Sequence, residues 1–324
     1  MIQELILGID TSNYTTSLAL MDLKGNLVSE ARRLLPVQEG SLGLRQSDAL
    51  FQHVKNLPEL CRALLEAVGE YRLVGVSGAI KPRPLEESYM PVFLAASSYG
   101  ETISQIMQVP FFPYSHQEGH IEAGLWSAKI QFEQSFLAFH LSGGTTELLL
   151  VRPEKEGYHI DIIGGSSDIS AGQMIDRVGV RLGLPFPAGP HLEALANKWK
   201  GGNSEVPMSI KGTSISFSGP ETFFQRLIVK GTPPEEIAYL VLQCIGKSLA
   251  ACIKNAGKQQ KQENILLVGG VASNQIIKHI LENKLEKAQR LCFGEAKYCS
   301  DNAVGISALG VKKIINYRRQ QLCK

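Results

Sequence analysis

The pattern of apolar and polar residues along the chain occurs twice. Residues 5–28 read as an apolar strand, a small polar turn, a second apolar strand and a glycine turn, and residues 136–158 repeat this order. Each unit has the pattern of a β-hairpin whose tip carries Ser, Thr, Gly or Asn. Two similar hairpins about 130 residues apart predict a duplicated architecture, with one hairpin opening each half.

Helical patterns follow each hairpin. A strand at 73–80 leads into the Pro-rich segment KPRPLEESYMP, which we interpret as a loop. The expected helices are 47–68 with a kink near Pro58, 92–108, 171–184, 235–256 and 302–316. Strands that alternate with helices predict an α/β class in both halves.

The composition is that of an ordinary globular protein. Of 324 residues, 44% are hydrophobic and 20% charged, and the net charge of +2 neither indicates nor excludes a nucleic-acid partner. The N-terminus predicts a strand rather than a signal peptide, and we expect no membrane-spanning segment and a cytoplasmic location. The six cysteines form no C-x-x-C pair and predict free thiols: Cys61, Cys244, Cys252, Cys292, Cys299 and Cys323.

The segment SHQEGH at 115–120 places two histidines one helical turn apart. Ser115 and Glu118 have the spacing of a capping box, so a helix should begin here and carry His116 and His120 on one face. Both would lie near the positive end of the helix dipole, which favours the neutral imidazole that binds metals. Two partly exposed histidines at a helix start are the simpler alternative.

The same segment argues against a zinc peptidase. The motif H-E-x-x-H needs its glutamate directly after the first histidine, where it can act as a general base. Gln117 occupies that position here, and the role of Glu118 is explained by capping. The spacing therefore predicts a metal site of another kind.

A glycine turn, LSGGTTEL, joins the two strands of the second hairpin. Glycines let backbone N–H groups approach an anion closely, and neighbouring hydroxyls add donors. A plain hairpin tip is the simpler interpretation of one such turn. The candidate phosphate ligands in it are Ser142, Gly143, Gly144 and Thr145.

Two further turns favour the phosphate interpretation. The tip of the first hairpin carries Thr11, Ser12 and Asn13, which makes a matched pair of tips. The segment LLVGGVASN places Gly269 and Asn274 between a strand and a helix, the usual place for a nucleotide in α/β folds. Neither G-x-G-x-x-G nor a P-loop is present.

Three carboxylates remain open to two interpretations. Glu193 follows a rigid Pro/Gly turn early in a helix and can meet a ribose hydroxyl. Asp176 sits within a predicted helix, where a solvated position beside Arg177 is the alternative. Asp301 opens the last helix, either as an ordinary cap or as a third, oxygen ligand for the metal of the histidines.

Taken in order, six motifs resemble one family. HQEGH, LSGGTTEL, AGQMIDRVGVRLGLPFPAGPHLE, SISFSG, LLVGGVASN and SDNAVG together are similar to the tRNA threonylcarbamoyladenosine synthase family, also known as O-sialoglycoprotein endopeptidase-like. The resemblance covers most of the chain. It implies the duplicated actin, sugar-kinase and heat-shock-ATPase-like (ribonuclease H-like) fold, with a cleft between two domains. We place these domains at 1–130, completed by the helix 303–324, and at 131–302.

The resemblance also implies an activity and its residues. A threonylcarbamoyl group would move from threonylcarbamoyl-AMP to an adenosine next to the tRNA anticodon, with release of AMP. His116, His120 and Asp301 look like the ligands of one iron or zinc ion. The residues that look like phosphate, adenosine and ribose contacts are Ser142, Gly143, Gly144, Thr145, Asp176, Gly189, Glu193 and Asn274. The partners implied are tRNA, a paralogous actin-like subunit and a small ATPase.

Four departures from the family pattern favour a divergent paralogue. Tyr14 and Thr15 stand where the family has an acidic pair, and Thr145 stands where it has a histidine. Pro220 and Glu221 replace an expected lysine, and KPRPLEESYMP replaces a glycine-rich loop. The alternatives are another carbamoyl or acyl transfer, ATP hydrolysis, or a nucleotide-dependent subunit that binds partners without catalysis.

Overall fold

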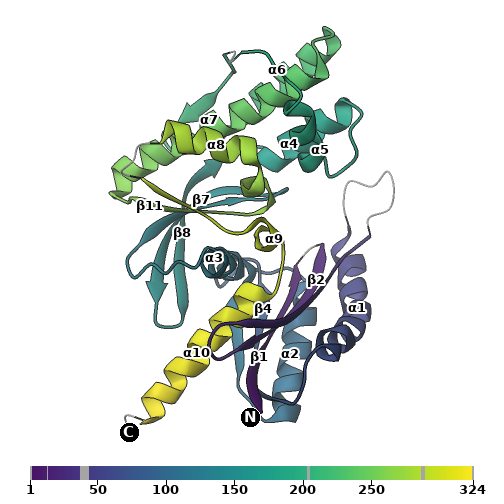
Figure 1. Ribbon diagram of the computed structural model, residues 1–324, viewed down its shortest axis with the longest axis vertical. Coiled ribbons are helices and arrows are strands. Elements are labelled where there is room, and N and C mark those ends of the chain that lie inside the picture. The colour runs from purple at the N-terminus through teal and green to yellow at the C-terminus, as the bar shows by residue number, and fades with distance from the viewer. Residues whose placement is uncertain (1, 13, 37–43, 203–204, 286–288, 323–324) are drawn as a thin grey trace. The chain divides into compact units, whose positions relative to one another are not determined.

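The structure is a computed structural model, and the chain in it divides into two compact units (Figure 1). It describes residues 2–12, 14–36, 44–202, 205–285 and 289–322. Unit 1 comprises Met1–Gln131, Pro153–His159 and Asp301–Lys324, and unit 2 comprises Phe132–Arg152 and Ile160–Ser300. The division differs from the expected domain limits at three places, because Gln131, Pro153–His159 and Asp301 with Asn302 fall in unit 1.

Unit 1 is built on a mixed five-stranded sheet in the order β3-β2-β1-β4-β5. The first three strands form an antiparallel meander, and β4 and β5 continue the sheet in parallel with β1. Both faces of β1 and β2 are buried, which explains their nearly continuous apolar sequences. The strands are β1 (Gln3–Ser12), β2 (Thr15–Asp22), β3 (Leu27–Leu34), β4 (Tyr71–Lys81) and β5 (Phe111–Ser115).

Four helices complete unit 1. They are α1 (Gln46–Glu66), α2 (Phe93–Met107), α3 (His116–Ser127) and α10 (Val304–Leu322). The helix expected at 47–68 is confirmed as α1 with Pro58 inside it, and the one expected at 92–108 is confirmed as α2. Leucines of α1 and alanines of α2 pack with β1, β2 and β4 into one apolar cluster.

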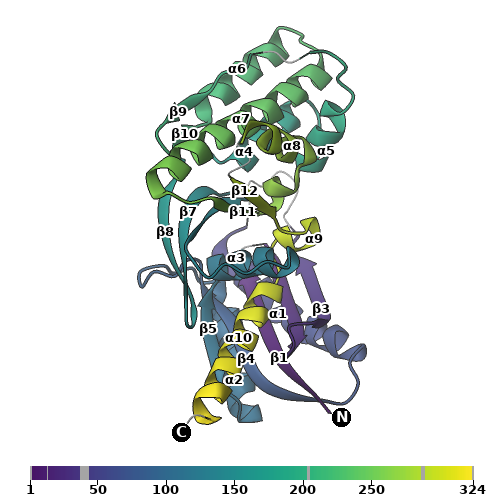
Figure 2. The same cartoon turned by 60° about the vertical axis from the view of Figure 1, so that its left-hand side comes forward.

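The last helix of the chain, α10, packs against β1 at very short range. A Cβ atom on Gly8 of β1 would lie 2.7 Å from the carbonyl oxygen of Ala303 and 2.7 Å from the amide nitrogen of Ser307. The Ser307 hydroxyl donates to the carbonyl of Ile6 over 3.1 Å. Figures 1 and 2 both show α10 beside β1 and β4. A glycine at position 8 therefore allows the C-terminal helix to join the N-terminal sheet.

Unit 2 repeats the strand order of unit 1 within a larger sheet, β12-β11-β6-β7-β8-β10-β9. In both units the first two strands pair antiparallel, and the next two lie parallel to the first. The duplication that the two hairpins predict is thus confirmed in the sheets. The strands are β6 (Phe136–Leu141), β7 (Thr146–Glu154), β8 (Gly157–Ser166), β9 (Ser209–Lys211), β10 (Ser214–Ser216), β11 (Asn264–Val268) and β12 (Arg290–Phe293).

The helices of unit 2 surround α7, which contributes heavily to its core. They are α4 (Ala171–Arg181), α5 (Gly189–Ala196), α6 (Ser218–Val229), α7 (Pro234–Gln260), the 3₁₀ turn η1 (Gly270–Ser273), α8 (Gln275–Lys284) and α9 (Ala296–Cys299). Val241, Ile245 and Leu249 of α7 are fully buried among side chains of the sheet and of the neighbouring helices. Figure 2 shows α6, α7 and α8 together on one side of the sheet of unit 2.

The expectation that no segment is long and apolar enough to cross a membrane is wrong for α7. By length and composition this helix passes that test, and it is the one helix among the described residues that does. In the structure, 78% of its most apolar window is buried. A helix that is apolar on all sides is what the core of unit 2 requires.

Candidate metal centre and nucleotide loops

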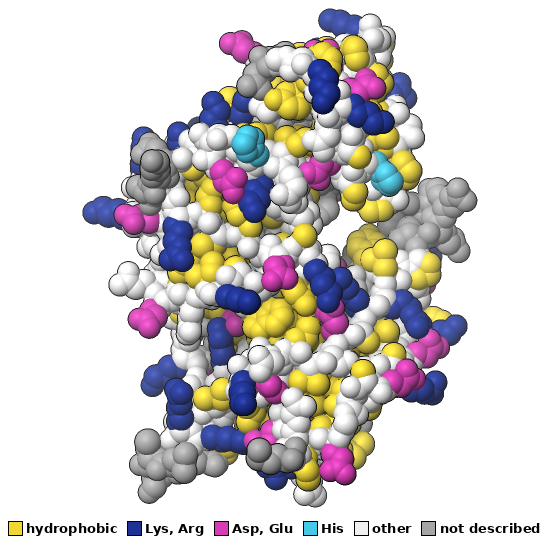
Figure 3. Space-filling model, in the orientation of Figure 1, with side chains coloured by type: hydrophobic (Ala, Val, Ile, Leu, Met, Phe, Trp, Pro, Cys, Tyr) yellow, Lys and Arg dark blue, Asp and Glu magenta, His cyan; other side chains and the backbone are white. Residues whose placement is uncertain are grey.

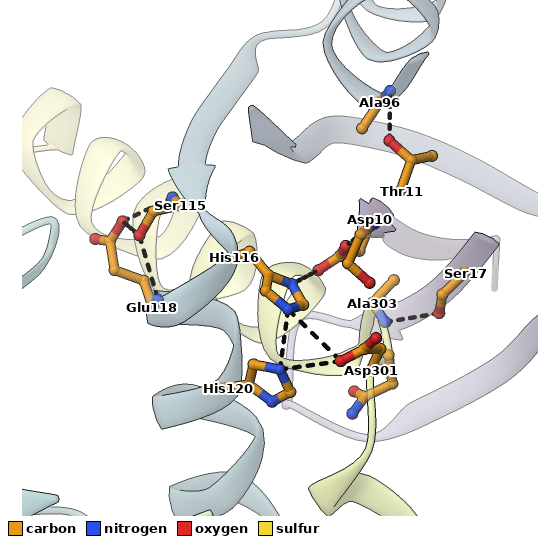
Figure 4. Close-up of polar contacts among 12 residues, drawn as sticks. Asp10, Thr11, Ser17, Ala96, Ser115, His116, Glu118, His120, Asp301 and Ala303 are labelled. Carbon is orange, nitrogen blue, oxygen red and sulfur yellow. Dashed lines mark hydrogen bonds and ion pairs between the residues drawn. The ribbon is translucent and has the colours of Figure 1, made fainter. Parts of the chain in front are cut away.

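The helix that carries the two histidines begins with the capping box expected from the sequence. The Ser115 hydroxyl accepts from the Glu118 N–H over 3.2 Å, and Glu118 Oε2 accepts from the Ser115 N–H over 2.8 Å. This pairing confirms that Glu118 serves to start α3 and faces away from the histidines (Figure 4). The peptidase arrangement is therefore absent from α3, since Gln117 occupies the position of its general base.

His116, His120 and Asp301 meet at one point in unit 1. The two Nε2 atoms are 3.0 Å apart, and Asp301 Oδ1 lies 3.6 Å from Nε2 of His116 and 3.3 Å from Nε2 of His120. Figure 4 shows the three side chains turned toward one another. Two of them come from α3 and the third from the segment just before α10, so that the last helix completes the cluster.

Asp10 contacts His116 at Nδ1, whereas Nε2 of the same ring faces His120 and Asp301. This carboxylate follows the apolar run of β1, is 1% exposed, and places Oδ2 2.7 Å from Nδ1 of His116. Its other oxygen accepts from the Ser12 N–H over 2.9 Å. A histidine that donates Nδ1–H to a carboxylate presents its Nε2 lone pair, which is the form that metal-binding histidines usually take. Asp10 was not among the site residues expected from the sequence, although a carboxylate directly after the apolar run of a buried strand is a signal for a functional site.

The carboxylates of Asp10 and Asp301 flank His116, and a positive charge between them is stabilised. Burial disfavours the charged form of His116, but Asp10 and Asp301 outweigh it and raise the pKa of this imidazole to about 10. Burial likewise opposes the ionised form of Asp301, and its contacts with His116 and His120 override this and hold its pKa well below the usual range. A divalent cation at the same point supplies the positive charge that a proton otherwise provides.

Asp301 does not cap the last helix. The side chain of Asn302 accepts from the Val304 N–H over 3.0 Å, and the Ser17 hydroxyl accepts from the Ala303 N–H over 2.7 Å. Both residues satisfy the exposed N–H groups at the start of α10, which leaves the Asp301 carboxylate to the histidines. The simpler interpretation of Asp301, an ordinary N-cap, is therefore contradicted by the local hydrogen bonds.

The donor set suits a transition-metal ion. Ligands at about 2.1 Å from one metal keep neighbouring donor atoms roughly 3.0 to 3.4 Å apart. Two of the separations in this cluster, 3.0 and 3.3 Å, fall within that spacing, and the third, 3.6 Å, is slightly wider. Imidazole nitrogen with carboxylate oxygen suits zinc or iron rather than calcium.

The tip of the first hairpin is occupied by internal contacts. The Thr11 hydroxyl donates to the carbonyl of Val92 over 2.8 Å and accepts from the Ala96 N–H over 3.1 Å, at the start of α2. Ser12 is buried beside Asp10, and Asn13 lies outside the described residues. The Thr11 hydroxyl thus holds α2 in place, and its position does not present it as a phosphate donor.

Near this tip lies a buried histidine that was not among the site residues expected from the sequence. His53 of α1 is 0% exposed, with Nδ1 2.9 Å from the Thr16 hydroxyl. That hydroxyl accepts from the Asn56 amide over 3.3 Å, so its proton is free to be donated to a neutral ring. Burial lowers the pKa of His53 to about 4, against the opposing pull of Asp10 and of the Ser12 backbone.

The glycine turn of unit 2 stays open to solvent. A Cβ atom on Gly143 or Gly144 would meet nothing within 4 Å, and both residues are exposed. Ser142 shapes the turn, since its hydroxyl accepts from the Thr145 N–H over 3.0 Å. The turn keeps two glycines facing outward, as a backbone anion site requires.

Two other elements of unit 2 adjoin this turn. A Cβ atom on Gly172 of α4 would be 2.5 Å from the Cα of Gly143, and one on Gly269 would be 2.2 Å from the carbonyl oxygen of Leu141. The Ser170 hydroxyl donates to the Gly143 carbonyl over 2.6 Å. The start of α4 and the turn before η1 are thus packed against the glycine turn at one edge of the sheet.

The remaining predicted nucleotide residues lie on the helices around this edge. Asp176 accepts from the Ala188 N–H over 2.8 Å just before α5, and burial raises the pKa of its carboxyl. Gly189 opens α5, and Glu193 within it accepts from the Gln275 N–H over 2.6 Å at the start of α8. Asn274 caps α8 by accepting from the Ile277 N–H over 2.9 Å. These side chains position the starts of two helices, α5 and α8, and their contact with a nucleotide stays a prediction.

A comparison with known families identifies the chain. Residues 88–308, about two thirds of the sequence, match the model of TsaD, tRNA N6-adenosine threonylcarbamoyltransferase. The chain belongs to the TsaD family. The resemblance seen in the six sequence motifs is thereby confirmed.

Curated relatives agree at low identity. The chain is 26% identical over 316 residues to the probable bifunctional tRNA threonylcarbamoyladenosine biosynthesis protein of Methanobrevibacter smithii, covering 96% of this chain and 55% of that protein. It is 28% identical over 281 residues to the tRNA N6-adenosine threonylcarbamoyltransferase of Prochlorococcus marinus, covering 82% of this chain and 76% of that protein. The chain spans about half the length of the bifunctional relatives that it matches.

Solved structures confirm the fold. HypF of T. kodakarensis superposes with a TM-score of 0.62 at 15% identity, covering 97% of this chain and 48% of that one. An activator of 2-hydroxyisocaproyl-CoA dehydratase from Clostridium difficile gives a TM-score of 0.53 at 13% identity and covers 98% of this chain and 97% of that one. A glucokinase from Streptomyces griseus gives 0.52 at 12% identity, covering 94% of this chain and 98% of that one. This TsaD-family chain therefore has the actin, sugar-kinase and heat-shock-ATPase-like fold.

The burial of His53 should make the free energy of unfolding depend on pH. The unfolded chain takes up a proton at this position as the pH falls below 6.5, whereas the folded protein does so only near pH 4. The free energy of unfolding should therefore fall with pH in this window, by at most about 1.4 kcal/mol per pH unit from this group. Replacing His53 with Gln should flatten the slope between pH 6.5 and 4.

The measurement uses urea unfolding at a series of pH values. Fluorescence of Trp126 in unit 1, recorded in a Trp199→Phe background, follows the unit that contains His53. His279→Gln at an exposed position of α8 is the control and should keep the original slope. An unchanged slope in His53→Gln would show that the ring is not held neutral by the fold.

Proposed function

We propose that this protein transfers a threonylcarbamoyl group, in a metal-dependent reaction, from threonylcarbamoyl-AMP to the adenosine next to the anticodon of tRNA. The convergence of His116, His120 and Asp301 within one unit carries the proposal, together with membership of the TsaD family. The names of the relatives, tRNA threonylcarbamoyladenosine biosynthesis protein and tRNA N6-adenosine threonylcarbamoyltransferase, support the same substrate class.

The chain's own residues prepare the metal site. Asp10 fixes the tautomer and direction of His116, the capping box fixes the first turn of α3, and Asn302 leaves the Asp301 carboxylate unused by the helix. A bound zinc or iron ion would act as a Lewis acid toward carbamoyl or phosphate oxygens. Three protein ligands leave further coordination positions for such oxygens.

In unit 2, the glycine turn would receive the phosphate of the adenylate. Gly143 and Gly144 are exposed and carry no side chains, so they would offer their backbone N–H groups to an anion beside the N-terminus of α4. Asp176, Glu193 and Asn274 lie on the surrounding helices and would border the adenosine. AMP would leave from this edge after the transfer.

The partner set follows the family resemblance. We propose tRNA as the acceptor in the cytoplasm, with a paralogous actin-like subunit and a small ATPase as helper proteins. On the face shown in Figure 3, Lys and Arg side chains are scattered and interspersed with acidic and apolar ones. This distribution agrees with the net charge of +2 and favours help from partner proteins in holding a tRNA.

A second candidate is transfer to a different acceptor. Tyr14 and Thr15 occupy the hairpin positions where the family has an acidic pair, and Thr15 is buried. Asp10 and the candidate ligand Asp301 are carboxylates that lie beside the histidines. A site that keeps its metal ligands and its glycine turn, but lacks the acidic pair, suits another carbamoyl or acyl acceptor.

The metal site can be tested by its ligands. Protein reconstituted with Zn²⁺ should hold one ion per chain, measured by elemental analysis after gel filtration. His116→Ala with His120→Ala should lose that ion and remain folded, since the pair contributes little to the apolar core. Asp10→Asn should weaken binding about 10- to 100-fold, because the imidazole loses its anionic support. Stoichiometric zinc in the double variant would eliminate this site.

The transfer itself has a direct assay. The purified protein and the helper proteins would be incubated with threonylcarbamoyl-AMP and unmodified tRNA, and the modified nucleoside measured by mass spectrometry. Asp301→Asn should reduce product at least about 100-fold through loss of a ligand, whereas His279→Gln on α8 should match the wild type. Absence of the modified nucleoside contradicts the proposal; AMP release without it favours another acceptor, and binding without turnover favours a partner-binding subunit.

A further inference from the structure

The positions of α3 and α10 decide whether the three candidate ligands meet. His116 and His120 belong to α3, and Asp301 lies three residues before the first residue of α10. The two helices touch backbone to backbone, because a Cβ atom on Gly305 would be 1.9 Å from the carbonyl oxygen of Gly119. The side chain of Ile306 packs on Gly119 at the same place. This apolar contact brings the helices close, and a directional polar contact further along them adds control over sliding and rotation.

A buried carboxylate on α3 provides that control. Glu122 is 3% exposed, and its Oε2 lies 2.6 Å from Nζ of Lys312 on α10. The Tyr158 hydroxyl reaches the same oxygen over 2.5 Å, and the Lys312 ammonium lies 5.8 Å from the centre of the Tyr158 ring. One oxygen atom thus joins α3, α10 and the segment Pro153–His159.

The ion pair between Glu122 and Lys312 restricts the movement of α10 relative to α3. A buried carboxylate that loses its cation is left uncompensated in a medium of low polarity, so the contact tolerates little movement. Burial first, and then the charge of Glu122, keeps the pKa of Tyr158 well above its ordinary value. The phenol therefore stays protonated and donates to the carboxylate, which fixes the third side of the contact.

We propose that Glu122, through Lys312 and Tyr158, is a positioning residue that sets the register of α10 on α3 and thereby the distance from Asp301 to the two histidines. This inference rests on the metal site proposed above. Glu122 itself lies away from the ligand cluster, between α3 and α10 on the Tyr158 side. It acts on the metal through the helices alone.

The test uses Co²⁺, whose visible absorption depends on the geometry and identity of its ligands. Glu122→Gln keeps the size of the side chain and removes its charge, and Lys312→Met removes the cation. Both should raise the Co²⁺ dissociation constant about 10-fold or more and change the absorption bands. Lys312→Arg keeps a cation within reach and should restore binding close to the wild-type value.

The chain offers a matched control. Lys313, the next residue of α10, pairs with Glu156 in the same segment that carries Tyr158. Lys313→Met removes an ion pair between these same two elements without involving α3, and should leave Co²⁺ affinity within about twofold of the wild type. Tyr158→Phe keeps the ring beside Lys312. It should raise the Co²⁺ dissociation constant more than Lys313→Met does and less than Lys312→Met does.

The outcomes separate this inference from the proposed function. Normal Co²⁺ affinity and absorption in Glu122→Gln and Lys312→Met, with a lower melting temperature, would show that the contact only stabilises the fold. Equal losses in Lys312→Met and Lys313→Met would also overturn the inference. Failure of the wild-type protein to bind Co²⁺ removes the metal site and this inference with it, whereas failure of tRNA transfer leaves the binding comparison unaffected.

Discussion

The contact between α10 and the N-terminal unit is the constraint on which the rest of the site depends. Gly8 of β1 accepts the backbone at the start of α10 at a distance that no Cβ atom permits, and Gly305 of α10 approaches the backbone of α3 equally closely. Gly119 of α3 leaves room for the side chain of Ile306. Only this approach brings a carboxylate from the far end of the chain beside two histidines on α3. The ligand set is thus a consequence of helix packing, and a single added methyl group at these glycines would separate it.

Charge then gives the packed cluster its chemistry. Asp10 and Asp301 flank His116 in a largely buried place, and this arrangement demands a positive charge. A proton meets the demand in one state, and a divalent cation meets it in another. The same carboxylates orient the imidazole and, in the proposed site, would prepare it for a metal that stabilises developing negative charge.

The duplicated fold uses its two hairpin tips differently. In unit 1 the Thr11 hydroxyl is hydrogen-bonded to the carbonyl of Val92 at the start of α2, and His53 is hydrogen-bonded to Thr16 near the tip. In unit 2 the equivalent tip carries glycines that face outward beside the start of α4. The same hairpin pattern thus lies in the unit that carries the candidate metal ligands in the first case and forms a candidate anion-binding turn in the second. The difference lies in side chains, because the strand order of the sheets is the same.

The sequence by itself determined the duplicated hairpins, the α/β class, the capping box at Ser115 and the family, because these depend on local periodicity, spacing and ordered motifs. It also suggested His116, His120 and Asp301, but left Asp301 open between a cap and a ligand. Only the tertiary structure excluded the cap, because Asn302 takes that role, and the ligand role stays a prediction. Asp10, His53 and Glu122 were likewise hidden in the sequence, since their partners are distant along the chain and meet them only when α1, α3 and α10 pack around β1. The apolar pattern of α7 shows the same limit, because burial inside unit 2 is a property of the fold and not of the segment.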